Sequence, residues 1–324
     1  MPTAITTRPP ADLAQLEDLS RRAEASARNA KAENTRRAYR ADWAHFTTWC
    51  IAAGLAPLPA LPQTVAIYLE ALSDTAKIST MRRRLVAISQ AHQAAQLDPP
   101  TTSILVREVL KGIARRKASE GEHTTQKAPT VTEDIRSMVA TLAPTALGTR
   151  DRALLLIGFA GAFRRAELVS LDVGDIRFTR SGLVVRLRRS KTDQEGEGRS
   201  VGIPFGSQPA TCPVKALRAW LKVAGITDGP IFRPITRHGH IAAERLSAGA
   251  VATIVKRSAQ AAGLEPAQYA GHSLRSGLAT SAAAAGVSER AIMNQTGHKS
   301  VVVARRYIRE GSLFRDNAAA AVGL

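Results

Sequence analysis

A chain of 324 residues is longer than one hydrophobic core usually serves, so we expect two domains. Its 45 Lys and Arg residues outnumber its 27 Asp and Glu residues, which leaves a formal net charge of +18. Both halves share this excess, because residues 1–126 carry 17 basic and 12 acidic side chains and residues 127–324 carry 28 and 15. Such a charge favours a polyanionic partner for both halves.

The apolar runs of the chain argue against a membrane protein. The longest candidate, ALLLIGFAGAF, falls short of the roughly 18 apolar residues that a spanning helix needs. The N-terminal segment MPTAITTRPPADLAQLEDLS lacks the apolar core of a secretory signal. Cys50 and Cys212 supply neither a disulfide framework nor a zinc site. We therefore expect a cytoplasmic protein without a membrane partner.

The first half of the chain predicts a series of helices. In ENTRRAYRADWAHFTTWC an apolar stripe recurs at steps of four, three and four, formed by Tyr39, Trp43, Phe46 and Cys50. Asn34 is the expected N-cap of this helix, and Gly54 is expected to end it. The segments VAIYLEAL, ISTMRRRLVAISQAHQAA, led by Ser79 and Thr80, and ILVREVLKGIARRK predict three further helices.

Two arginine clusters lie on these helices. One falls mostly off the apolar stripe, and the other occupies the first turns of a later helix: Arg36, Arg37 and Arg40, then Arg82, Arg83 and Arg84. Arginine is unfavourable beside the positive end of a helix dipole unless phosphates approach that end. A solvated helix face is the alternative interpretation of both clusters.

A polar stretch, SEGEHTTQKAP, has no apolar period and contains the expected interdomain linker, residues 121–129. Thr130 and Glu133 match a capping box that opens the second half. Helices are expected near 133–143 and 149–161, and alternation then predicts strands near 175–179, 183–188 and 199–204, with a Gly-rich turn between the last two. Helices return with CPVKALRAWLKVAG and continue to the end.

Several polar residues of the second half stand in apolar or tightly spaced surroundings: Arg164 and Glu167 in GAFRRAELVSL, Lys191 in RRSKTDQ, His272 and Arg275 in GHSLRSG, His298 in TGHKS and Tyr307 in RRYIRE. The set lacks a carboxylate pair suited to metal binding and lacks a Gly-rich nucleotide loop. Arginine forks bind phosphodiester oxygens, a tyrosine is a nucleophile, and a lysine or histidine protonates a leaving oxygen. These residues suit phosphate chemistry that needs no metal or other cofactor.

In order and spacing, these segments resemble the tyrosine recombinases of the phage integrase family. GAFRRAEL matches the family's first box, SKT matches its hairpin lysine, and GHSLR, TGH and RRY match its second box. Together with ENTRRAYRADW the resemblance covers nearly the whole chain. It implies a mainly α protein with an N-terminal, all-helical, SAM-like core-binding domain (1–120) and a C-terminal α+β catalytic domain (130–324) with a small antiparallel sheet and a C-terminal docking helix.

The resemblance also implies the role of each site residue. Arg164 and Arg275 would clamp the scissile phosphate, and Tyr307 would attack it. Lys191 would be the general acid for the 5′ oxygen. His272 would be its acid/base partner, His298 would donate a hydrogen bond to the phosphate, and Glu167 would orient its neighbours. The six arginines of the helical half would contact DNA. Tyr269 is a rival nucleophile by proximity, but it precedes the second box and is expected to be structural.

The resemblance also implies a reaction and an assembly. Family members exchange strands through a 3′-phosphotyrosyl intermediate and a Holliday junction, as homotetramers on two double-stranded DNA sites with inverted repeats. Their C-terminal helices pack into neighbouring subunits. The stretch before residue 33 is short for an additional arm-binding domain, so none is expected. Two alternatives stay open: a topoisomerase of type IB, which rejoins the same strand, and a DNA-binding regulator that is not an enzyme.

Overall fold

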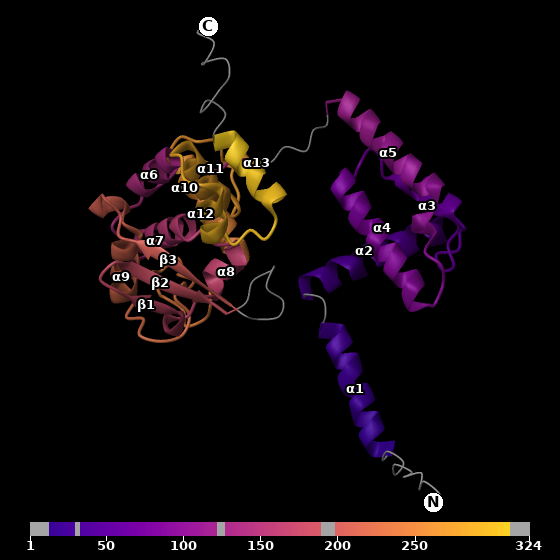
Figure 1. Cartoon of the computed structure of the whole chain (residues 1–324), viewed down its shortest axis with the longest axis horizontal. Coiled ribbons are helices and arrows are strands. Elements are labelled where there is room, and N and C mark those ends of the chain that lie inside the picture. The colour runs from indigo at the N-terminus through magenta and orange to yellow at the C-terminus, as the bar shows by residue number, and fades with distance from the viewer. Residues whose placement is uncertain (1–12, 30–32, 122–126, 189–197, 312–324) are drawn as a thin grey trace, which may run out of the picture. The chain divides into compact units, whose positions relative to one another are not determined.

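The computed structural model describes residues 13–29, 33–121, 127–188 and 198–311 (Figure 1). The chain divides into two compact units, residues 1–124 and 125–324, and each is considered by itself. The first unit is entirely helical over its described residues, with α1 (Leu13–Asn29), α2 (Glu33–Ala52), α3 (Pro62–Ala71), α4 (Ile78–Ala94), the short 3-10 helix η1 (Pro100–Thr102) and α5 (Ile104–Ser119).

The core of the first unit forms around the predicted stripe of α2. Phe46 and Cys50 are fully buried, and the Phe46 ring meets the Tyr68 ring of α3 edge to face at 4.9 Å. α2 packs against α4, and α3 packs against α5. Gly54 ends α2 as predicted, with a φ of +67°, and the amide of Leu55 donates to the Cys50 carbonyl at 2.8 Å.

Two expected helix starts in this unit are wrong by a few residues. α2 begins at Glu33, so Asn34 lies inside its first turn, where its amide oxygen accepts a hydrogen bond from Arg37 at 3.0 Å. A side chain that is bonded forward within the helix is not an N-cap. α3 begins at Pro62, earlier than the apolar run predicts, because proline is favourable at the first helical position.

In the second unit a small sheet lies at one side of the helices (Figure 1). Strands β1 (Ile176–Phe178), β2 (Gly182–Leu187) and β3 (Arg199–Pro204) pair antiparallel in that order. Val185 pairs with Ile176 on one side and Val201 on the other, and Leu183 and Leu187 share its buried face. The three predicted strands are confirmed. The predicted Gly-rich turn and Lys191 lie outside the described residues.

The helices of this unit in chain order are α6 (Thr132–Ala140), α7 (Ala146–Ala160), α8 (Arg165–Ser170), η2 (Val173–Asp175), η3 (Pro209–Thr211), α9 (Pro213–Val223), α10 (Ala248–Ala261), η4 (Pro266–Gln268), α11 (Ser273–Ala284), α12 (Glu289–Thr296) and α13 (Val301–Gly311). α7 packs against α9, and α11 packs against both α7 and α13. The predicted fold class, mainly α with a small antiparallel sheet in the second half, is confirmed.

The predicted capping box at Thr130 and Glu133 is wrong by one residue. α6 has Val131 as its N-cap, and Asp134 accepts a hydrogen bond from the Val131 amide at 3.1 Å. Thr130 is fully buried, and its amide donates to the Ser273 carbonyl at 3.0 Å. That tertiary contact fixes Thr130 before the helix starts.

Residues 127–132, which we call the strap, lie across the start of α11. The Ala128 amide donates to the Gln268 carbonyl at 2.9 Å, and the Thr132 amide donates to the Ser281 hydroxyl at 3.1 Å. At Gly277 on α11 a Cβ atom would lie 1.8 Å from the Thr130 carbonyl oxygen. Only glycine therefore allows α11 and the strap to approach so closely.

Candidate active site

Five of the six predicted catalytic residues meet in one cluster of the second unit. Arg164 precedes α8, His272 and Arg275 begin α11, His298 follows α12, and Tyr307 lies on α13. Lys191, the sixth, lies outside the described residues. The five come from four segments that are separated by up to 143 positions in the chain (164 to 307), so the fold alone brings them together.

A tight turn positions Arg164. α7 ends at Ala160, and Ala162 then takes a left-handed conformation with a φ of +50°, which is uncommon for a residue with a Cβ. The turn aims the Ala162 carbonyl at α11, where it accepts a hydrogen bond from Arg275 Nη1 at 2.8 Å. The backbone of the first box thus holds the second arginine of the pair.

Glu167 fixes the position of Arg164 through two hydrogen bonds. Its carboxylate is buried and accepts hydrogen bonds from the Arg164 amide at 2.9 Å and from Arg164 Nη1 at 2.5 Å. The two contacts fix both the backbone and the side chain of Arg164, while the guanidinium stays partly exposed. This is the geometry that an orienting role for Glu167 requires.

Arg275 is a buried cation with unused donors. It is 1% exposed, and its Nε and Nη2 atoms have no hydrogen-bond partner among the described residues. Burial, and next the charge of Arg164, lower its pKa to about 10. Because buried guanidinium donors are almost always satisfied in native structures, two unused donors point to an anion that binds there.

His272 lies next to the hydroxyl group of Tyr307. Its Nε2 atom is 3.0 Å from Tyr307 Oη, and the Tyr307 side chain is largely buried against α11. His272 keeps part of its surface exposed, yet desolvation within the cluster, followed by the charges of Arg275 and Arg164, lowers its pKa. A neutral imidazole at this distance is able to accept the phenolic proton.

His298 stacks on the nucleophile candidate. Its ring centroid is 5.8 Å from that of Tyr307 at an interplanar angle of 21°. Burial is the main cause that lowers its pKa to about 4, and Arg275, Arg164, His272 and Arg199 add to it. His298 is therefore neutral at pH 7, and only one of its ring nitrogens carries a proton.

The buried Thr296 hydroxyl selects which nitrogen that is. Thr296 Oγ1 lies 2.8 Å from His298 Nδ1 and 2.8 Å from the Ile292 carbonyl. The hydroxyl has one proton for two acceptors. When Thr296 donates to Nδ1, His298 presents Nε2–H as a donor. When it donates to Ile292, Nε2 becomes an acceptor.

Sequence reasoning missed three residues that build the site. Gln295 donates to the carbonyls of Ala160 at 2.8 Å and Gly202 at 3.1 Å, and it thereby ties α12 to α7 and β3. Thr296 and Gln295 adjoin the predicted Gly297 and His298, so their position was a usable signal. Arg199, the third, is one cation among many in a basic stretch, and no local pattern marks it.

The six predicted DNA-binding arginines differ in their surroundings. Arg37, Arg40 and Arg82 are exposed. Arg83 donates twice to Asp42, and Arg84, which is largely buried, donates to Tyr68 Oη at 3.2 Å. Arg36 pairs with Glu33. Contacts of these side chains with DNA stay a prediction.

Tyr269, the rival nucleophile, is engaged elsewhere. Its side chain is 6% exposed, and its hydroxyl donates to Asp134 on α6 at 3.2 Å. Burial and the Asp134 carboxylate raise its pKa to about 12. Because the raised pKa keeps this phenol protonated and its hydroxyl is bonded to Asp134 on α6, a structural role remains our expectation for Tyr269.

Two absences among the described residues bear on other functions. In this part of the chain, no helix is both long and apolar enough to cross a membrane. Within the same ranges, His, Cys, Asp and Glu side chains form no group of three or more that could hold a metal ion.

The known proteins that are similar in sequence to this chain are integrases and recombinases. The model of the phage integrase family matches residues 130–312. An integrase/recombinase XerD homologue of Selenomonas ruminantium is 42% identical over 306 residues, which are 93% of this chain and 89% of the relative. Recombinase Cre of Escherichia phage P1 is 26% identical over 282 residues, 82% of this chain and 80% of the relative.

Solved structures agree on the fold. The XerH recombinase bound to a palindromic difH substrate superposes with a TM-score of 0.61 at 17% identity, over 82% of this chain and 73% of that one. The Tn1549 transposon integrase in complex with transposon right-end DNA gives a TM-score of 0.61 at 15% identity, over 91% and 97%. With the matched boxes and the cluster around Tyr307, these likenesses show that the chain belongs to the phage integrase family, as a tyrosine recombinase.

Proposed function

We propose that Tyr307 is the nucleophile with which this recombinase cuts and rejoins DNA at specific sites. Family membership makes the protein a site-specific recombinase that breaks and rejoins DNA strands. The observation that supports the assignment to Tyr307 is its hydroxyl, 3.0 Å from His272 Nε2, in a cluster where the buried Arg275 keeps two donors unused.

In the proposed reaction Tyr307 Oη attacks the scissile phosphorus, and a phosphorus–oxygen bond to the tyrosine forms as the bond to the 5′ oxygen breaks. His272 accepts the phenolic proton, and Lys191 donates a proton to the departing 5′ oxygen. A 5′-hydroxyl from the partner strand then attacks the phosphotyrosyl link and restores a phosphodiester. One phosphoester replaces another, so the exchange needs no external energy source.

The two arginines stabilise the charge that builds up on the phosphate. Arg275 offers Nε and Nη2 from a buried position, and Arg164, held by Glu167, approaches from the start of α8. In a desolvated site such donors act at low effective dielectric and need no reorganisation. His298 adds a hydrogen bond in the tautomer that places the proton on Nε2.

Trapping the covalent intermediate tests the nucleophile. A suicide substrate that is nicked next to the scissile phosphate should accumulate a protein–DNA adduct in EDTA, and Tyr307→Phe should abolish it. Tyr269→Phe and Tyr68→Phe are matched controls, since both remove a buried phenol and should retain the adduct. An adduct that persists in Tyr307→Phe would refute the assignment.

Sulfur substitution tests Lys191. A substrate whose bridging 5′ oxygen is replaced by sulfur releases a thiolate, which needs no proton. Lys191→Ala should therefore cleave this substrate far better than the oxygen substrate, whereas Arg164→Ala should gain nothing from sulfur. Equal behaviour of the two variants would remove Lys191 from the role of general acid.

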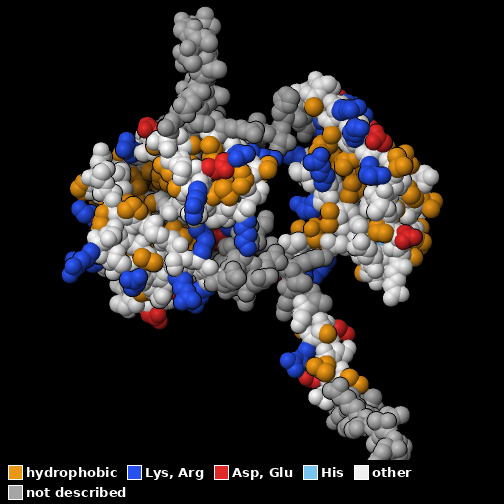
Figure 2. Space-filling model, viewed as in Figure 1, with side chains coloured by type: hydrophobic (Ala, Val, Ile, Leu, Met, Phe, Trp, Pro, Cys, Tyr) orange, Lys and Arg blue, Asp and Glu red, His pale blue; other side chains and the backbone are white. Residues whose placement is uncertain are grey.

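The partner and assembly follow as finer proposals. Solved relatives are bound to DNA, and basic side chains outnumber acidic ones on the faces visible in Figure 2. The first unit would act as the core-binding domain on double-stranded DNA in the cytoplasm, and homotetramers would join two inverted-repeat sites. Deletion of residues 312–324, the proposed exchanged helix, should preserve binding of single sites and weaken cooperative pairing. Relaxation of supercoils without recombinant products would instead indicate a topoisomerase.

A further inference from the structure

Arg199 is tied to the end of α12, although the reaction described above does not use it. It is the first residue of β3, and its guanidinium donates to the last carbonyls of α12: Gln295 at 3.1 Å, Asn294 at 3.3 Å and Thr296 at 3.4 Å. The final four carbonyls of a helix have no partner within the helix, and they form its negative end. Arg199 therefore caps α12 from a different element.

The guanidinium also lies within electrostatic reach of the catalytic cluster. Burial lowers the pKa of Arg199, whereas Glu167 raises it and Arg164 lowers it. Arg199 thus interacts both with the carbonyls at the end of α12 and, electrostatically, with Glu167 and Arg164.

The turn after α12 is shaped to this guanidinium. Gly297 has a φ of +66°, and a Cβ atom on it would lie 2.8 Å from Arg199 Nε and 2.9 Å from Cζ. The left-handed backbone favours glycine, and a Cβ atom there would displace the neighbouring guanidinium from its place. The next residue is His298, whose ring stacks on Tyr307.

We propose that Arg199 is a positioning residue for the recombination reaction. It holds the turn of Gly297 and His298 through the carbonyls of α12, and this turn sets the position of the His298 ring against Tyr307 and the phosphate. Arg199 itself contacts none of the reacting atoms. The inference rests on the proposed function of Tyr307 and His298.

The first test separates chemistry from binding. Arg199→Ala should slow single-turnover cleavage of the suicide substrate by about 10- to 100-fold, because a displacement of about 1 Å costs that much. Its affinity for the intact site should stay within about twofold, a difference of under 1 kcal/mol. Arg199→Lys retains donors for the carbonyls and should recover part of the rate.

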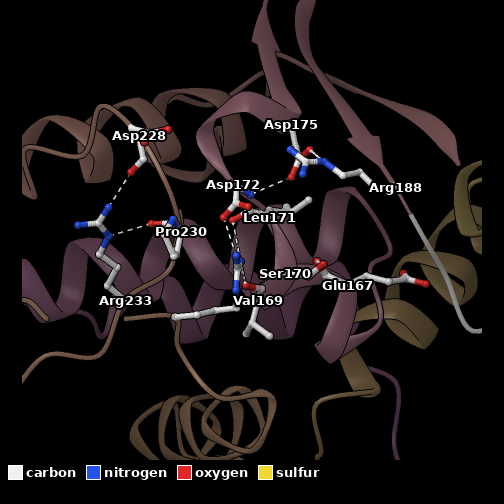
Figure 3. A network of polar contacts seen from close by, with 11 residues as sticks. Glu167, Val169, Ser170, Leu171, Asp172, Asp175, Arg188, Asp228, Pro230 and Arg233 are labelled. Atoms are coloured by element: carbon white, nitrogen blue, oxygen red, sulfur yellow. Dashed lines mark hydrogen bonds and ion pairs between the residues drawn. The ribbon is translucent and has the colours of Figure 1, made fainter. Parts of the chain in front are cut away.

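Arg233→Ala is the matched control. Arg233 also donates to backbone carbonyls, those of Pro230 and Asp228, but none of its contacts reaches the cluster (Figure 3). It should lose stability as Arg199→Ala does and keep the cleavage rate. If Arg199→Ala fails to fold, Arg199→Gln, which keeps an uncharged NH2 group as a donor, takes its place in the comparison.

A double-mutant cycle tests whether Arg199 acts through the turn at Gly297. Gly297→Asn keeps a residue that tolerates left-handed backbone but adds a Cβ against Arg199. It should slow cleavage strongly in the wild-type background and much less in Arg199→Ala, where the guanidinium is gone. Additive losses, a wild-type rate in Arg199→Ala, or a loss of affinity equal to the loss of rate would each overturn the inference. Absence of a Tyr307-dependent adduct in the wild-type protein would instead refute the proposed function.

Discussion

Each unit of the chain contains a cluster of tyrosine, histidine and arginine, and only one of the two is built to react. In the first unit Tyr68 Oη lies 2.9 Å from His45 Nδ1 and accepts a hydrogen bond from Arg84 at 3.2 Å. In the second, Tyr307 Oη lies 3.0 Å from His272 Nε2 beside Arg275. The residue types and the distances nearly coincide.

The two clusters differ in how their arginines are bonded to carboxylates. Asp42, buried in the first cluster, accepts two hydrogen bonds from Arg83, at 2.6 and 3.0 Å, and lies 3.8 Å from Arg84. Tyr68 is fully buried, and desolvation is the main cause that raises its pKa to about 12. In the second cluster the buried Glu167 carboxylate bonds Arg164, and no carboxylate among the described residues bonds Arg275, whose Nε and Nη2 donors stay unused. A buried arginine with unused donors, rather than the combination of tyrosine, histidine and arginine, distinguishes the reactive cluster.

The largest expected effect comes from removing one arginine of each cluster. Arg275→Met should lower the cleavage rate by about 10² to 10³, the usual loss for a transition-state donor. Its free energy of unfolding should stay level or rise, because a buried charge with few partners is removed. At saturating DNA, Arg83→Met should leave the cleavage rate near wild type, and it should lower the free energy of unfolding by about 1.5–3 kcal/mol, since Asp42 loses charged hydrogen bonds.

Urea unfolding and single-turnover cleavage of the same three proteins provide the comparison. If Arg275→Met is destabilised as much as Arg83→Met, Arg275 is a structural residue, and the contrast between the clusters disappears.

The second prediction concerns the hydroxyl that selects the His298 tautomer. Thr296→Val keeps the shape of the side chain and removes the hydroxyl that is bonded to Nδ1, so single-turnover cleavage should fall about tenfold, the equivalent of 1.4 kcal/mol. Thr296→Ser retains the hydroxyl and should stay near wild type. Nitrogen chemical shifts of His298 report the tautomer directly, and identical shifts in the valine variant would contradict its assigned role.

The third prediction concerns pH. The pKa values of His45, His272 and His298 are all lowered in the folded state, that of His298 to about 4, so the unfolded chain binds more protons between pH 4 and 6.5. Stability should therefore fall as pH drops below 6.5 and should not depend on these groups above it. Cleavage should be level above pH 6.5 and fall only at a lower pH, below the lowered pKa of His272, because His272 must be neutral.

The second unit, with two such histidines, should lose more stability than the first. Trp220 reports unfolding of the second unit, and Trp43 and Trp49 report the first, in variants that retain only one set. His298→Gln should flatten the pH dependence followed by Trp220. Because these imidazoles are partly exposed, we expect a fraction of the roughly 1.4 kcal/mol per pH unit that a single proton provides. An equal slope for both units would break the comparison.

The smallest effect concerns cations at the surface. Neutralising Arg36, Arg37 and Arg40 together should flatten the slope of log affinity against log salt by up to about 0.9 for each phosphate group that these arginines neutralise. Arg116→Gln is the control, since it removes an exposed cation outside the two arginine clusters, one that pairs with Glu70 at 2.6 Å. An unchanged slope in the triple variant would return the three arginines to a solvated helix face.

The sequence predicts much of this molecule because its signals are local. The stripe of α2, the glycine that ends it and the three strands each follow from spacing within a few residues. The boxes around Arg164, His272 and Tyr307 predict the cluster because their order and spacing resemble those of the phage integrase family. Asn34 and Thr130 are not the N-caps that the sequence predicts. Asn34 is bonded to Arg37 inside the helix, and Thr130 is held by a contact with Ser273 from a distant segment.

What the sequence does not reveal are the contacts that join distant segments. Arg199 reaches carbonyls about 95 positions away, and nothing near it in the chain distinguishes it from other arginines. Arg188 at the end of β2 is similar, since its ion pair with Asp175 at 2.6 Å appears only once the sheet is formed (Figure 3). The unused donors of Arg275 are likewise a property of the folded site alone.

The strap sets where this protein can be divided. A catalytic fragment that begins at Val131 would keep every residue of α6 and every catalytic side chain, yet it would lose the backbone hydrogen bonds that Ala128 and Thr130 donate beside α11. It would also uncover Gly277, and α11, which carries Arg275, would face solvent where it now meets backbone. A fragment that begins at Thr125 retains these bonds, together with the one from Lys127 Nζ to the Ala267 carbonyl at 2.5 Å. The minimal active fragment is therefore defined by residues that precede its first helix, and an expression boundary chosen by that helix would cut through the support of the active site.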